Sequence, residues 1–301
     1  MSVPHDDDLA RAFEHERPRL LRVAYSTTGS LAEAEDCVQE SWLRLRRVPD
    51  PGAIRDLRGW LTTVVGRLAL DALGSARARR ERYVGTWLPE PLVEPAGTVR
   101  PADPAEQVTL DESVSMALLV VLDELSPAQR TAFLLHDVFG LPFTQVAEVV
   151  GRTPAAVRQL ASRARRHVER SRPHEPAPRA EQWRLVRAFA AACQEGDLEG
   201  LVRLLDPEVA WRGDGGGLVS SLPGVVRGAE QVARGLVAFG GGRLPPGTMR
   251  VVTVNGAAGL VLYGPEGDVS VAAFTVDGGR ITAIDVQRNP EKLTSVRFPE
   301  G

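Results

Sequence analysis

Apolar residues recur at helical spacing through much of the chain and alternate with polar residues near its end. The stretch 31–45 predicts a helix because its apolar residues share one face. They are Leu31, Ala34, Val38, Trp42 and Leu45. A second helix is predicted over 57–73, with an apolar stripe of Leu57, Trp60, Leu61, Val64, Leu68 and Ala72. Together these helices indicate a small helical bundle.

The pattern over 125–166 predicts two short helices joined by a tight turn. The first covers Phe143–Val150, and Gly151 can take the left-handed conformation that ends it. Thr153 can cap the second helix, where Pro154 occupies the first turn and needs no N–H donor. The second helix turns Val157, Leu160 and Ala161 inward. A packed helix, a glycine turn and a second helix are the parts of a helix-turn-helix.

Positive charge is concentrated on the second of these helices. Seven arginines and one acid, Glu169, lie between Arg152 and Arg172, although the whole chain has a net charge of −3. A basic helix in this position can offer its outward side chains to the major groove of DNA. The alternative is a helical domain whose basic face is merely solvated.

The last third of the chain has a different pattern. Helices are predicted over 181–205 and 227–239, followed by strands over 249–254, 259–263, 268–276 and 280–287. Asp277-Gly278 lies between two alternating runs and predicts a hairpin turn. Helices followed by a curved antiparallel sheet indicate an α+β cone.

Composition divides the 301 residues into domains and linkers. We expect a helical domain over 9–82, a proline-rich linker over 83–104, the helix-turn-helix domain over 105–170 and the α+β domain over 180–293. The two cysteines lie far apart and lack metal-ligand spacing, so we expect neither a disulfide nor a metal site. The acidic N-terminus and the absence of a long apolar run predict a cytoplasmic protein that contacts no membrane.

Several motifs carry a family resemblance. AEAEDCVQESWLRL (32–45) resembles the region of extracytoplasmic-function (ECF) sigma-70 factors that docks on RNA polymerase, and RDLRGWLTTVVGRLALDAL (55–73) resembles the helix after their promoter-melting loop. The 125–166 stretch resembles the domain that reads the −35 element. YVGTWLPEPL (83–92), DGGG (214–217) and NPEKL (289–293) are similar to the group with a fused SnoaL-like domain, ECF group 41.

This resemblance implies a fold, partners and residue roles. The fold would be two all-α sigma domains and an α+β cone of the SnoaL-like, nuclear-transport-factor-like type. The partners would be core RNA polymerase and promoter DNA, with no cofactor. An exposed acidic helix face suits a basic partner; its residues are Asp36, Gln39, Glu40 and Trp42.

The resemblance and the charges also assign DNA contacts. Arg55, Arg58 and Trp60 would face the −10 element, where melted DNA is held by basic grooves and base pockets. Trp60 also lies on the apolar stripe, which favours a core position. In the second helix of the helix-turn-helix, Arg158, Ser162 and Arg165 are expected at base edges, and Arg152, Arg163 and Arg166 at phosphates.

The fused domain is expected to regulate the sigma domains in cis. The segment Trp87, Leu88, Pro89, Glu90, Pro91 and Leu92 is apolar and stiffened by proline, although it stands in a linker. We expect it to dock near two motifs of the third domain. Those are Asp214, Gly215, Gly216 and Gly217, and then Asn289, Pro290, Lys292 and Leu293. Leu218 departs from the group, which usually has lysine there.

Two other functions remain open. One is a simple DNA-binding regulator, for which the helices at 31–45 and 57–73 would be unnecessary. The other is a DNA-binding protein fused to a cyclase- or isomerase-like enzyme, with Asp214, Asp268 or Asp285 as the acid or base inside the cone. We expect no catalytic residue, because the strand acids should face solvent or cap turns. An unidentified small molecule in the cone is a further possible partner.

Overall fold

The computed structural model describes residues 4–80, 83, 85–96, 115–171, 177–221, 224–239, 248–264 and 267–296. The chain forms two compact units. The first contains Met1–Glu81 and Val121–Ser171, and the second contains Arg82–Val120 and Arg172–Gly301. Among the described residues, no helix combines the length and the apolar character needed to span a bilayer.

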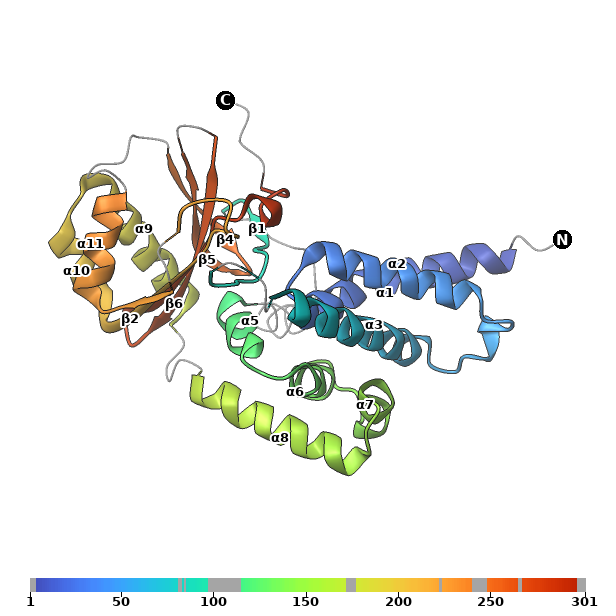
Figure 1. The fold of residues 1–301 in the computed structure, drawn as a ribbon. Helices are drawn as coiled ribbons and strands as arrows, with labels where there is room; N and C mark the ends of the chain where they lie inside the picture. The colour runs from blue at the N-terminus through green and yellow to red at the C-terminus, as the bar shows by residue number, and fades with distance from the viewer. Residues whose placement is uncertain are drawn as a thin grey trace. The chain divides into compact units, whose positions relative to one another are not determined.

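The first unit begins with three helices, drawn in blue to teal in Figure 1. They are α1 (Pro4–Thr28), α2 (Leu31–Arg46) and α3 (Leu57–Arg80), with a 3₁₀ turn, η1 (Pro51–Ala53), before α3. Ser30 starts α2, because its side chain accepts a hydrogen bond from the Glu33 amide at 3.4 Å. The core of the bundle includes the fully buried Leu20, Val23, Leu45, Leu61 and Val65.

The rest of the first unit carries the helix-turn-helix. It follows α5 (Met116–Asp123) and consists of α6 (Pro127–Phe133), a π-helical turn η2 (Leu134–Val138), α7 (Phe143–Val150) and α8 (Pro154–Ser171). The predicted turn is confirmed: Gly151 ends α7 at φ 67°, and the Thr153 hydroxyl accepts from the Ala156 amide at 3.3 Å.

Within the first unit, the helix-turn-helix packs directly on the N-terminal bundle. Arg130, only 1% exposed, donates from Nε and Nη2 to the Ser26 carbonyl at 3.2 and 2.8 Å. Arg19 donates to the Thr62 hydroxyl at 2.6 Å and to the Phe139 carbonyl at 3.4 Å. A buried arginine held by a backbone carbonyl fixes this packing, since its charge has no solvent to replace that bond.

The second unit is built on one seven-stranded sheet of order β1-β4-β5-β6-β7-β2-β3. Its strands are β1 (Val93–Glu94), β2 (Leu205–Asp214), β3 (Val225–Arg227), β4 (Met249–Val254), β5 (Ala257–Tyr263), β6 (Val269–Asp277) and β7 (Arg280–Gln287). Neighbouring strands are antiparallel except β2 and β7, which run parallel. Helices α9 (Arg179–Glu195), α10 (Leu198–Leu204) and α11 (Ala229–Phe239) complete the unit.

The two faces of this sheet are covered differently (Figure 1). One face packs against α9–α11 around an apolar core that includes Phe189, Val209, Leu260 and Ile284, with Phe274 at its edge. The opposite face, called here the outer face, has a smaller apolar cluster. It comprises Met116, Val254, Val261, Val271, Ala273 and Leu293. An α+β cone with helices on one face is the predicted fold, and the expected fold class is confirmed.

Three strands and three helices were not expected from the sequence pattern. The sequence did not predict α1, α5, α6, β1, β2 or β3, and it placed the β6–β7 turn one residue early. The observed turn is Gly278-Gly279, with φ of 55° and 75°, between the paired residues Asp277 and Arg280. Two successive positive φ values define a type I′ turn, which glycine adopts without strain.

Candidate functional site: the linker clamp and the nucleic-acid interface

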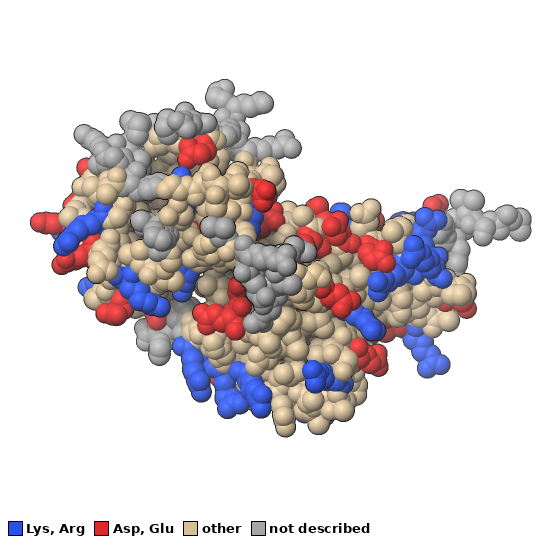
Figure 2. Space-filling model, in the orientation of Figure 1, with Lys and Arg blue, Asp and Glu red and all other residues tan. Residues whose placement is uncertain are grey.

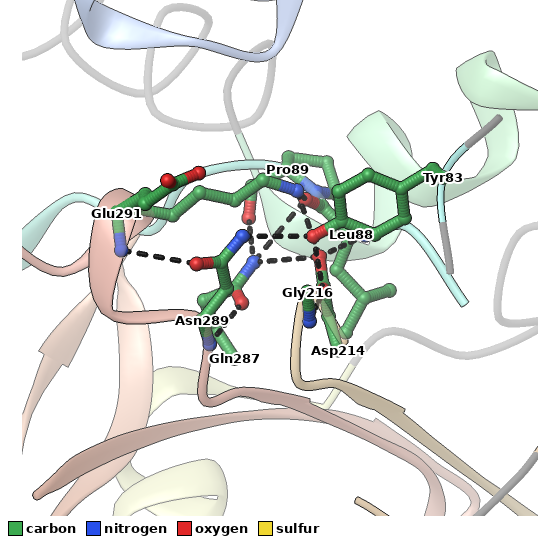
Figure 3. Close-up of polar contacts among 9 residues, drawn as sticks. Tyr83, Leu88, Pro89, Asp214, Gly216, Gln287, Asn289 and Glu291 are labelled. Atoms are coloured by element: carbon green, nitrogen blue, oxygen red, sulfur yellow. Dashed lines mark hydrogen bonds and ion pairs between the residues drawn. The ribbon is translucent and has the colours of Figure 1, made fainter. Parts of the chain in front are cut away.

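Asp214, the last residue of β2, is the centre of a polar cluster on the outer face of the sheet (Figure 3). Its carboxylate is fully buried. Oδ1 accepts from the Tyr83 hydroxyl at 2.6 Å and the Gly216 amide at 3.0 Å. Oδ2 accepts from the Leu88 amide at 2.8 Å and Gln287 Nε2 at 3.1 Å. Two of these donors, Tyr83 and Leu88, belong to the linker.

Lys292 supplies the positive charge of this cluster. Its Nζ lies 2.7 Å from Asp214 Oδ2 and 2.7 Å from the Leu88 carbonyl oxygen. The ammonium also lies 4.2 Å from the centre of the Trp87 ring and 4.9 Å from that of Tyr83, which are cation–π distances. The only lysine of the chain therefore forms an ion pair with Asp214 and binds the linker through a carbonyl and two aromatic rings. We call Tyr83, Trp87, Leu88, Asp214, Gln287, Asn289 and Lys292 the linker clamp.

The linker is also held by its backbone. Gln287 Nε2 donates to the Leu88 and Pro89 carbonyls at 3.2 and 3.3 Å. Further along, the Leu92 amide donates to Asn255 Oδ1 at 3.0 Å, and the Leu92 carbonyl accepts from the Asn255 amide at 2.8 Å. Val93 and Glu94 then pair with β4 as an edge strand. Pro89, Glu90 and Pro91 are buried, so the whole predicted segment lies on the second unit.

The two C-terminal motifs each have a local role in shaping the clamp. Gly216 has φ 65°, and a Cβ there would meet the Asn289 side chain at 2.5 Å, so only glycine fits. Asn289 caps a 3₁₀ turn, η3 (Pro290–Lys292), by accepting from the Glu291 amide at 3.0 Å. Asn289 Nδ2 donates to the Tyr83 hydroxyl at 2.9 Å, and Leu293 is buried in the outer-face cluster. The turn thus aims Lys292 at Asp214.

Sequence reasoning missed Tyr83, Gln287 and Asn255 as parts of this site. Tyr83 begins the linker motif, and Gln287 stands two residues before the NPEKL motif, but neither type alone signals a contact. Burial, followed by the hydrogen bond to the Asp214 carboxylate, raises the pKa of Tyr83 far above its ordinary value, so the hydroxyl stays a donor. Leu218, the position that departs from the group pattern, is 60% exposed.

The acids considered for catalysis do not lie inside the cone. Asp214 and Asp285 point to the outer face, on the opposite side of the sheet from Ile284 and Val286. Asp285 was expected at solvent, but it is 4% exposed and paired to Arg212 at 2.8 Å. Burial raises the pKa of Asp285, and Arg212 opposes that shift. Asp268 lies near the surface, 3.3 Å from Arg288.

The arginines of α8 form an exposed basic surface. Arg158, Ser162 and Arg165 face solvent, as do Arg152, Arg163 and Arg166. Basic side chains gather over the C-terminal half of α8 in the space-filling view (Figure 2). Val157, Ala161, Ala164 and Val168 are buried on the opposite face of the helix. The helix therefore presents its charge outward, as a helix that enters a major groove must.

Two of these arginines are held by residues in η2 and at the start of α7. Arg165 Nε donates to Asp137 Oδ1 at 2.7 Å, and its Nη2 donates to the same oxygen. The Arg158 guanidinium lies 5.4 Å from the centre of the Phe143 ring, which stacks on His136 with centroids 3.6 Å apart. Sequence reasoning did not select His136, Asp137 or Phe143, because they follow no helical or charge pattern.

The residues expected at polymerase and the −10 element are spread over α2 and the start of α3. Asp36 and Gln39 are exposed, Glu40 pairs with Arg44 at 3.0 Å, and Trp42 is half-buried, 5.0 Å from the Phe13 ring. Arg55 and Arg58 are exposed near η1, and Trp60 is half-buried. The structure brings these side chains to the surface or its edge without showing what they bind.

Two family models match the helical parts of the chain. Residues 12–79 match the model for sigma-70 region 2, and residues 115–168 match the model for sigma-70 region 4. We use "region 2" and "region 4" for these parts below. A helical bundle followed by a basic helix-turn-helix is the arrangement of a sigma factor, the class of protein that brings RNA polymerase to promoters.

Full-length relatives narrow the class. The chain is 44% identical to the ECF RNA polymerase sigma factor SigJ of Mycobacterium tuberculosis, over 96% of this chain and 94% of that protein. It is 37% identical to the probable ECF sigma factor SigI of the same species, over 98% of each chain. The crystal structure of M. tuberculosis SigJ matches with a TM-score of 0.79 and 40% identity, over 97% of this chain and 100% of that one. The chain belongs to the ECF RNA polymerase sigma factor family.

Proposed function

We propose that this sigma factor is restrained in cis by the linker clamp. In this proposal, α2 and the start of α3 contact polymerase and the −10 element, and α8 reads the −35 element. The second unit limits how far region 2 and region 4 can separate. The observation that carries the restraint is the buried Asp214 carboxylate, which accepts from two linker groups and is paired with Lys292.

Geometry explains why holding the linker matters. The −10 and −35 elements are roughly 80 Å apart along a duplex that rises about 34 Å per turn. Region 4 packs on region 2 through Arg130 and Ser26, so a single body of this kind must open to reach both elements. Releasing the 12 linker residues 83–94 adds up to roughly 40 Å of reach at about 3.3 Å per residue.

The second unit acts in this proposal by binding its own linker and not by catalysis. Asp214 and Asp285, the buried acids on the strands of this unit that the structure describes, are engaged with Lys292 and Arg212 on the outer face. Neither is directed at the apolar core between the sheet and α9–α11. We assign no ligand to that core, and we infer no cofactor.

The test is run-off transcription with core RNA polymerase and the full-length chain, comparing the wild type with Lys292→Met. Methionine keeps much of the side-chain volume but removes the charge that pairs with Asp214. We expect more transcript from a promoter of this factor, at sub-saturating factor concentration, because the linker is released more often. A drop in transcript with unchanged folding would mean that the clamp supports the active form.

A matched control removes a cation elsewhere in the same unit. Arg234 forms an exposed pair with Glu230 on α11, and both side chains are about 70% exposed. Arg234→Met should leave transcription unchanged, since exposed pairs contribute little. If neither variant directs transcription and the wild type also fails with core polymerase, the assignment of promoter recognition to this chain is wrong, whatever the clamp does.

A further inference from the structure

We propose that the π-helical turn η2 is the positioning element of the −35 reader, with Asp137 fixing Arg165 and His136 fixing Arg158 through Phe143. This inference deepens the proposed function, because it rests on Arg158 and Arg165 reading bases. It assigns a role in specificity to His136, Asp137 and Phe143, which lie outside α8, the helix proposed to read the bases.

The π-helical turn η2 sets the positions of the His136 and Asp137 side chains. The Phe139 amide donates to the Leu134 carbonyl at 3.0 Å, a bond that spans five residues where an α-helix spans four. The extra residue widens the helix after α6, and Gly140 then leaves it at φ 74°. The side chains of His136 and Asp137 consequently lie beside α7 and α8.

Asp137 orients the Arg165 guanidinium. Both Nε and Nη2 of Arg165 donate to Asp137 Oδ1, and the Asp137 side chain is only 14% exposed while that of Arg165 is 46% exposed. Arginine has five N–H groups in a fixed planar fork. Two point at Asp137, and the three others, on the Nη1 and Nη2 edge, are those that can bind guanine O6 and N7 together.

Arg158 is held by stacking. His136 Nδ1 lies 2.9 Å from the Leu141 carbonyl, so Nδ1 carries the proton, and the imidazole stacks on Phe143. The Arg158 guanidinium lies over the Phe143 ring. Both arginines are thus immobilised before DNA arrives, which lowers the rotamer entropy that each must lose on binding.

The charge of Asp137 gives this role a signature of its own. A carboxylate next to the DNA interface weakens attraction to every phosphate, but it aligns Arg165 for one base. Removing the charge with Asp137→Asn should therefore leave non-specific binding unchanged or stronger while discrimination at one −35 position falls. We expect that discrimination to drop about tenfold, within the range of one bidentate contact. If Asp137 only stabilised the fold, its substitution would weaken both non-specific binding and discrimination at the −35 element.

The experiment uses holoenzyme assembled from the full-length chain and core polymerase, on a promoter library randomised across the −35 element. Base preference at each position is read from transcript sequencing for the wild type, Asp137→Asn, Arg165→Ala and the double variant. We expect both single variants to lose preference at the same position. The double variant should match Arg165→Ala, because Asp137 acts through Arg165. Glu148→Gln, which removes an exposed acid from α7, is the charge control and should keep the wild-type profile.

The outcomes separate the inference from the function beneath it. If Arg165→Ala changes one position and Asp137→Asn changes none by more than twofold, Asp137 does not position Arg165. If the double variant loses preference at another position as well, Asp137 acts through a different group, and the inference also fails. If Arg165→Ala lowers all sequences equally, the assignment of Arg165 to base reading is wrong, and the positioning role falls with it.

The Arg158 half of the inference has a separate test. Phe143→Leu keeps an apolar side chain but removes the ring, and it should reduce preference at a −35 position different from the Arg165 position. Thermal unfolding identifies a variant that fails to fold. If Phe143→Leu folds and keeps the wild-type profile while Arg158→Ala loses a position, stacking does not position Arg158.

Discussion

The arginines of α8 and Lys292 are all cations, but their surroundings differ. The arginines of α8 stand on an exposed helix face, where their charge is available to a partner outside the molecule. Lys292 has 16% of its side chain exposed and is surrounded by Asp214, a carbonyl and two rings, so its charge acts on the chain itself. Removing an α8 arginine should therefore weaken DNA recognition and leave stability unchanged, whereas breaking the clamp should lower stability and release the linker.

The largest expected effect is in the clamp. Asp214→Ala leaves the Lys292 ammonium, the Leu88 amide and the Tyr83 hydroxyl without their common acceptor. Losing one partner of a buried ion pair costs about 3–5 kcal/mol. We expect hydrogen exchange at the Leu88 amide and in β2 to accelerate strongly, measured by mass spectrometry on the full chain. Glu230→Ala, in the exposed pair on α11, is the control and should leave those rates unchanged.

The next effect is in DNA recognition. Arg158→Ala should lower discrimination between the correct −35 element and a single-base mismatch by about 1–3 kcal/mol, the worth of one bidentate contact. The exposed position predicts an unchanged unfolding temperature. Competition binding of holoenzyme to matched and mismatched promoters measures the discrimination, and calorimetry measures the unfolding temperature. A large drop in stability would mean that the stack on Phe143 is structural, and the contrast between the two sets of cations would weaken.

The smallest effect is at an arginine expected on a phosphate. Arg166 is exposed, and its Nε lies 3.4 Å from the Ser162 carbonyl within α8. Arg166→Ala should weaken binding to all promoters similarly and reduce the slope of log K against log salt by about 1. Titrations over a range of salt concentrations measure this slope. A change that depends on promoter sequence would place Arg166 at a base.

The elements with strong periodicity could be predicted from the sequence, and those that depend on distant contacts could not. The helices α2, α3, α7 and α8 and strands β4–β7 follow from apolar patterns and glycine turns. Strand β2 contains Asp206, Pro207 and Glu208, which are typical of turns and lie in an irregularity between Leu205 and Ala210, the residues on either side that pair with β7. β1 is two residues long and exists only because β4 offers an edge.

The candidate site divides in the same way. The motifs around Asp214 and Asn289 could be selected by resemblance, and the expectation that the linker lies near them matches the contacts of Tyr83 and Leu88. The ion-pair partner of the Asp214 carboxylate could not be predicted, because no local pattern links Lys292 to a residue 78 positions earlier. The same limit hid Asp137, whose carboxylate meets an arginine 28 residues later only through a π-helical turn.

Strand β1 has a consequence for the lifetime of the released linker. Val93 and Glu94 cover part of β4 at the margin of the sheet, where its backbone N–H and C=O groups would otherwise face solvent. An uncovered strand of this kind is a template for pairing with another chain. In the proposed mechanism, release of the linker would therefore uncover an edge strand prone to self-association, and re-forming β1 would cover it again.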